Sequence, residues 1–129
     1  MRVNSDDFLL AAEQLLNNGS HEIDYRNCIS RAYYASFHAL APLSNQLPAA
    51  ANYQTKGSHD EKISKLTRCS SNQPEAKTLK AVGYEIQKRK SQRVKADYHI
   101  DDTIAKSDAE EQLIKVKFLL KQIANLKTL

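Results

Sequence analysis

The chain has few of the residues that interrupt regular structure, because only three glycines and three prolines are spread over its 129 residues. A β-sandwich or β-barrel needs many turns, and glycine and proline supply much of the turn chemistry. Alanine, leucine, lysine, glutamine and glutamate are abundant instead, and all of them favour helix. The composition therefore predicts one all-α domain spanning residues 1–129.

Long apolar segments and cysteine motifs are also missing. No run approaches the roughly 18 apolar residues of a membrane-spanning helix. The N-terminal sequence MRVNSDDFLL turns acidic where a signal peptide would be apolar. We expect a soluble, cytoplasmic protein with no membrane partner. Cys28 and Cys69 lack the CxxC spacing of a zinc or redox site, so two ordinary reduced cysteines are expected.

Positive charge is concentrated in one segment. Residues 1–24 hold one arginine against five acidic residues, whereas residues 77–95 hold seven lysines and arginines against one glutamate. Such a segment suits a polyanion such as RNA, although charge runs are more often solvated helix faces.

Apolar residues recur at spacings of three and four in separate segments, which predicts helices over about 5–17, 23–41 and 76–93. Ser58 with Glu61 and Ser107 with Glu110 match capping boxes, and they predict the starts of a short helix and of the last helix. The economical architecture is an antiparallel up-and-down bundle of four main helices plus a short helix.

The basic segment leads into RVKADYHID, residues 93–101, where an arginine precedes a histidine by six positions. RNA is cleaved without metal when a group of near-neutral pKa moves the 2′-hydroxyl proton and a fixed cation stabilises the phosphate in the transition state. Arg93 and His99 carry these two chemistries. On one continuous helix they would point about 120° apart. Their convergence therefore requires a helix break or a second protomer.

Simpler interpretations of the same residues remain open. If the helix continues through Asp97, that residue and Arg93 form an ordinary i to i+4 ion pair, and His99 is a helix-end residue. A metal site at His99, Asp101 and Asp102 lacks a further ligand at helical spacing. The other histidines and the aromatic residues considered for base stacking are more simply explained as structural residues: His38, His59, Tyr33, Tyr34 and Phe37.

Three blocks resemble those of the short prokaryotic HEPN proteins (higher eukaryotes and prokaryotes nucleotide-binding). These blocks are SRAYYASFHAL at 30–40, KGSHDEKISKL at 56–66 and RVKADYH at 93–99, and their order and spacing agree over nearly the whole chain. The third block resembles both the RxxADY signature of the short members and the Arg-x4-6-His motif of the ribonuclease members. The resemblance implies an antiparallel bundle of four to five helices, usually dimeric. Its active members cut RNA without metal or other cofactor and leave 2′,3′-cyclic phosphate ends.

The resemblance implies that Arg93 stabilises the transition-state phosphate and that His99 is the general acid or base. Val94 departs from the family pattern, because many active members place a polar residue directly after the motif arginine. The resemblance and the basic segment together predict a cleft lined by His59, Arg31, Asp97, Tyr98, Lys95 and Arg89.

The predicted function is a metal-independent endoribonuclease that cuts tRNA or mRNA, as a toxin or antiviral effector held silent by an antitoxin partner. One alternative is a non-catalytic HEPN module that binds a nucleotidyltransferase-type partner. Another is a protein that binds RNA or nucleotide without turnover, through Lys88, Arg89, Lys90 and Lys95.

Overall fold

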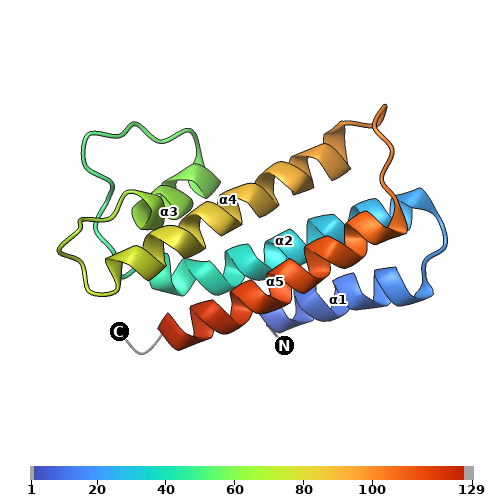
Figure 1. Ribbon diagram of the computed structural model, residues 1–129, viewed down its shortest axis with the longest axis horizontal. Helices are drawn as coiled ribbons and strands as arrows, with labels where there is room; N and C mark the ends of the chain where they lie inside the picture. The colour runs from blue at the N-terminus through green and yellow to red at the C-terminus, as the bar shows by residue number, and fades with distance from the viewer. Residues whose placement is uncertain (1, 127–129) are drawn as a thin grey trace.

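The computed structural model describes residues 2–126, and these form five α-helices with no strand among them. The helices are α1 (Ser5–Asn18), α2 (Glu22–Ser44), α3 (Ser58–Thr67), α4 (Ala76–Tyr98) and α5 (Lys106–Leu126). The four longer helices lie along the long dimension of the molecule, and the short α3 lies beside the first half of α4 (Figure 1). The prediction of an all-α chain is confirmed.

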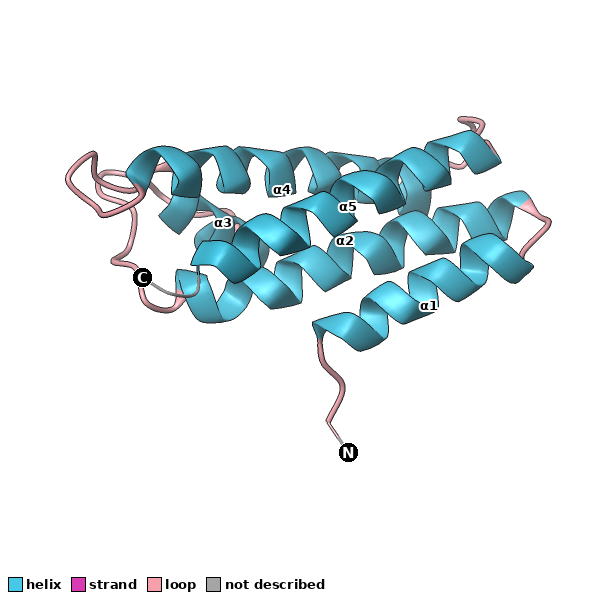
Figure 2. Ribbon diagram, turned by 60° about the horizontal axis from the view of Figure 1, so that its bottom comes forward, coloured by secondary structure: helices cyan, strands magenta, loops and turns pink. Residues whose placement is uncertain are grey.

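The central helix is α2, which contacts each of the other four helices. Figure 2 shows it between α1 on one side and α4 on the other. Its residues Tyr33, Leu40 and Leu43 are at most 1% exposed, and they pack in one apolar cluster with side chains of α4 and α5. Burying one side chain of this size contributes about 1.5–3 kcal/mol to folding. A second cluster joins α1 and the first half of α2 to α5 and to Ala96 of α4.

Two helices extend beyond their predicted ends. The helix expected to stop near Arg93 continues to Tyr98, because Ala96 is buried and Arg26 of α2 binds the carbonyl oxygens of its last turn. The helix expected to stop near residue 41 continues to Ser44 through Pro42. The buried Ser44 hydroxyl secures this final turn by donating to the carbonyl of Lys62 at 2.8 Å.

Both predicted capping boxes are wrong, because each helix has its N-cap one or two residues before the predicted serine. The N-cap of α3 is Gly57, whose φ of +113° is readily adopted only by glycine, so Ser58 already lies inside the helix. Before α5, the carboxylate that accepts a hydrogen bond from the Ala105 amide, at 2.8 Å, belongs to Asp108 and not to the expected Glu110. Cap positions depend on which nearby group reaches the free amides, and periodicity does not specify that.

The two cysteines are both buried and form no disulfide. Burial raises the pKa of the Cys28 thiol to about 11, which disfavours the reactive thiolate. Within residues 2–126, no helix combines the length and the apolar character that crossing a membrane requires.

Candidate functional site

Arg93 lies on the side of α4 that faces α2. Its guanidinium carbon is 5.5 Å from the ring centroid of Tyr33 and 5.6 Å from that of Tyr34. Its Nη1 is 3.6 Å from Oδ2 of Asp97, one turn further along α4, and the same oxygen accepts a hydrogen bond from Ser30 Oγ at 3.2 Å. Two aromatic rings and a carboxylate therefore fix the position of a cation whose side chain is only 12% exposed.

One nitrogen of the Arg93 guanidinium lacks a hydrogen-bond partner. Its Nε is buried and has no hydrogen-bond partner, and it is the only such side-chain nitrogen or oxygen in the described part of the chain. Leaving a buried donor unpaired costs about 1–3 kcal/mol. The Nε itself is closed to a ligand, so an anion would bind Arg93 through the 12% of its side chain that is exposed.

His59, at the start of α3, joins the same aromatic cluster. Its Nδ1 is 2.6 Å from the Tyr33 hydroxyl, and its ring stacks on Phe37 with a centroid distance of 4.0 Å and an angle of 7°. Its pKa is lowered below the ordinary 6.5, first by burial and then by the positive charges of Lys90 and Arg93 and by His38. The fold therefore brings a histidine and an arginine from distant parts of the sequence to one aromatic cluster.

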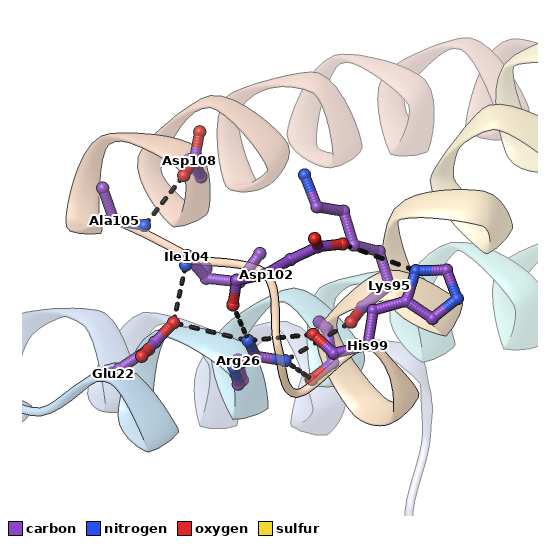
Figure 3. A network of polar contacts seen from close by, with 9 residues as sticks. Glu22, Arg26, Lys95, His99, Asp102, Ile104, Ala105 and Asp108 are labelled. Carbon is purple, nitrogen blue, oxygen red and sulfur yellow. Dashed lines mark hydrogen bonds and ion pairs between the residues drawn. The ribbon is translucent and has the colours of Figure 1, made fainter.

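His99 directly follows α4, and a buried arginine of α2 holds its backbone (Figure 3). Arg26 is 6% exposed, and its guanidinium donates to the carbonyl oxygens of Ala96 at 2.9 Å, of His99 at 3.2 Å and of Asp102. A cation at this position satisfies carbonyl groups that the end of a helix leaves without partners. Arg26 thus fixes the loop on which the motif histidine lies.

The imidazole of His99 lies outside that network. Its side chain is 58% exposed, and its Nδ1 is 3.6 Å from Oδ2 of Asp102. A carboxylate beside one imidazole nitrogen orients the ring, and an oriented imidazole is the usual acid–base group of enzymes.

Arg93 and His99 do not meet within one chain. No hydrogen bond, ion pair or ring contact joins them, because Arg93 pairs with Asp97 and His99 pairs with Asp102. The helix is unbroken from Arg93 to Tyr98, so six steps of rotation leave the two side chains about 120° apart.

The other predicted site residues are dispersed. Arg31 is exposed on α2, where it lines a shallow surface pocket against α1. Tyr98 is 68% exposed beside His99, and Lys95 is half-buried. The prediction that Arg89 lines the cleft is wrong, because its side chain is buried. Arg89 is 5% exposed and donates to Oε1 of Gln112 in α5 at 2.6 Å. A guanidinium committed to the α4–α5 contact does not line the cleft.

The sequence interpretation missed Arg26, Glu22 and the position of Lys90. Glu22 Oε1 lies 3.4 Å from Arg26 and accepts a hydrogen bond from the Ile104 amide at 2.6 Å, so it holds the loop from the other side. The helical spacing gave a signal for Arg26. It lies three positions before Ile29 and four before Ser30, so it falls on the buried side of α2. A charged residue on such a face needs a buried partner.

Among the described residues, no three histidine, cysteine, aspartate or glutamate side chains are grouped so as to hold a metal ion. Comparison of the chain with protein-family models, with curated proteins and with solved structures finds no match.

Proposed function

We propose that the chain is a metal-independent endoribonuclease of the HEPN type, which acts in the cytoplasm as a homodimer on tRNA or mRNA. The three sequence blocks that resemble this family support the proposal. So does the order of the helices, since α1, α2, α4 and α5 run alternately in opposite directions with the short α3 between α2 and α4 (Figure 1). A HEPN-like antiparallel bundle has this arrangement.

The observation that carries the proposal is that the two motif residues supply the two groups that the reaction needs, a fixed cation and an accessible imidazole. Arg93 is a cation held by a carboxylate and two aromatic rings, and His99 is an exposed imidazole beside a carboxylate on a fixed loop. His99 would take the proton of the 2′-hydroxyl, and Arg93 would stabilise the charge that develops on the phosphate. Attack by the 2′-oxygen would then break the bond from phosphorus to the 5′-oxygen of the next nucleotide, leave a 2′,3′-cyclic phosphate, and release that oxygen as a hydroxyl that takes its proton from water, while His99 returns its proton to solvent.

A second copy of the chain completes this site in our proposal. His99 is flanked by Tyr98 and Ile100, which are 68% and 79% exposed. Exposed apolar side chains on both sides of a polar group are typical of an interface that excludes water around that group. A homodimer that covers them brings His99 of one protomer to Arg93 of the other.

Cleavage of total cellular RNA by the purified protein in EDTA tests the activity. We expect fragments with 2′,3′-cyclic phosphate ends from the wild type, and at least a hundredfold loss in Arg93→Ala and His99→Ala. His21→Ala is the matched control, because His21 is also an exposed histidine 3.8 Å from an aspartate, Asp24, at the start of α2. Cleavage that persists in His99→Ala would contradict the proposal.

A second candidate is a non-catalytic module that binds an antitoxin or a nucleotidyltransferase-type partner. A groove of about 770 Å³ between α4 and α5 favours it, because Tyr84, Ile114 and Phe118 line this groove and are each more than half exposed. Such a surface suits the apolar face of a partner helix. Two results together would favour this function over the first. The wild type would co-purify with the partner while Phe118→Glu would not, and the pure protein would not cleave RNA.

A further inference from the structure

Lys90 and His59 lie at the same level of the contact between α3 and α4, close enough for the charge of Lys90 to act on the imidazole. The end of α3 lies against Gly83, where a Cβ atom would be 2.8 Å from Thr67 Cγ2 and 2.9 Å from Leu66 Cβ. The two helices run in opposite directions (Figure 1). Each residue advances about 1.5 Å, so the start of α3 falls about two turns further along α4. Those two turns lead from Gly83 to Lys90, and His59 is at the start of α3.

The hydrogen bond from Tyr33 assigns the tautomer of His59. Tyr33 is 1% exposed, and burial raises the pKa of its hydroxyl, so the phenol keeps its proton. Among the described residues, Nδ1 of His59 is the one acceptor within reach of this hydroxyl, and we therefore assign Tyr33 as the donor. A neutral imidazole that accepts at Nδ1 carries its hydrogen on Nε2. Stacking on Phe37 fixes the plane of the ring. His59 therefore offers one N–H donor in a fixed direction.

Positive charge on this side of α4 is incompletely neutralised. Lys90 is half-buried and forms no ion pair or hydrogen bond with the described residues, and Arg93 Nε has no acceptor. The nearby carboxylates are shared with other groups, although Asp60 also interacts with the charge of Lys90. Asp97 binds Ser30 and Arg93, while Asp60 binds the Tyr53 hydroxyl at 2.9 Å and the Lys56 amide at 2.7 Å.

We propose that His59, Lys90 and Arg93 form a subsite for a phosphate group of the RNA substrate. Arg93 and Lys90 supply the charge, and the fixed N–H of His59 supplies a directional hydrogen bond to a non-bridging oxygen. This inference deepens the proposed function and rests on it for the identity of the substrate. It gives His59 a binding role, separate from the acid–base role of His99.

Binding of a 2′-O-methyl RNA oligonucleotide, which lacks the attacking hydroxyl, tests the subsite without cleavage. Fluorescence anisotropy would compare His99→Ala with the same protein carrying Lys90→Ala, His59→Phe or His59→Gln. Lys90→Ala should raise Kd about fivefold to tenfold and reduce the slope of log K against log salt by about one. His59→Phe keeps the stacking but loses the donor, so it should weaken binding, whereas His59→Gln retains a donor and should recover most of it.

Lys77→Ala is the control, because Lys77 is an exposed lysine near the start of the same helix. It should leave Kd unchanged. Equal affinity in all the variants, or no binding by any of them, would overturn the subsite.

The experiments distinguish failure of the subsite from failure of the ribonuclease proposal. RNA binding that depends on Lys90 and His59, without cleavage of ordinary RNA by the wild type, would contradict the ribonuclease alone, whereas cleavage with binding indifferent to both residues would contradict the subsite alone.

Discussion

The guanidinium of Arg26 in α2 donates a hydrogen bond to the carbonyl oxygen of His99, 3.2 Å away beyond the end of α4. The same group donates to the carbonyl oxygen of Asp102 (Figure 3). It also donates to the carbonyl oxygen of Ala96. The central helix thus holds the loop that carries the motif histidine, and the stability of the fold is coupled to the position of His99.

Arg26→Ala should lower the free energy of unfolding by about 2–4 kcal/mol, because it leaves several carbonyl groups at the end of α4 without a donor. Urea unfolding measures the change. Arg31→Ala is the matched control, since Arg31 is exposed on the same helix and its loss should cost less than about 0.5 kcal/mol. Equal stability of the two variants would show that Arg26 does not hold the loop.

Asp97→Asn should reduce the cleavage rate about tenfold while changing stability by less than about 1 kcal/mol. Asp97 positions Arg93 from one turn away, and a partly exposed pair at 3.6 Å adds little to folding. The readout is kcat against KM on a defined RNA, beside an unfolding curve. Asp101→Asn is the control, because Asp101 is an exposed carboxylate on the neighbouring loop. A rate like that of the wild type would argue against a positioning role for Asp97.

The pKa of His59 should be below 6.5 when it is followed by NMR titration, and it should rise toward 6.5 in Lys90→Ala. Burial is the first cause of the lowered value, and the charges of Lys90 and Arg93 are the next. Because the unfolded chain then binds the proton more tightly than the folded chain, stability falls as pH decreases from above 6.5 toward the folded pKa.

The wild type should accordingly lose more stability than His59→Gln between pH 7.5 and pH 5, as read from urea midpoints at each pH. Gln does not titrate in this range, whereas every other ionisable group is shared by the two proteins. Parallel losses in both proteins would mean that His59 titrates alike in the folded and unfolded chains.

Gly83→Ala should lower the free energy of unfolding by about 1–3 kcal/mol, because the new methyl group would overlap Thr67 and Leu66 of α3. At an exposed helix position the same change would stabilise the protein by about 1 kcal/mol. Ser91→Ala on the exposed side of α4 is the control, and thermal unfolding measures both. A stabilised Gly83→Ala would mean that α3 does not pack closely there.

The helices were predictable from sequence because their apolar periodicity is strong, but their ends were not. The end of α4 depends on Arg26, about 70 residues earlier in the chain, whose hydrogen bonds reach carbonyl groups that periodicity does not reveal. Burial of Tyr33 and Phe37 followed from the pattern of α2. The exposure of His38 did not, although the helix around it is apolar.

The candidate site was only partly predictable for a related reason. Contacts one helical turn apart, such as that of Arg93 with Asp97, follow directly from spacing. The approach of His59 and Lys90 depends on how α3 packs on α4, and that packing is set by the close contact at Gly83. The side chain of Arg89 binds Gln112 of α5, whereas that of the next residue, Lys90, does not. The spacing of charged residues in the sequence does not reveal this difference.

The central claim is that Arg93 of one protomer works with His99 of the other, and subunit mixing tests it most directly. Arg93→Ala and His99→Ala, each inactive alone, would be co-expressed with different tags, and the heterodimer would be isolated and assayed in EDTA. One of its two sites would carry both substitutions and the other would carry neither, so the heterodimer should recover about half of the wild-type cleavage rate. A heterodimer as inactive as its two parents would contradict the account.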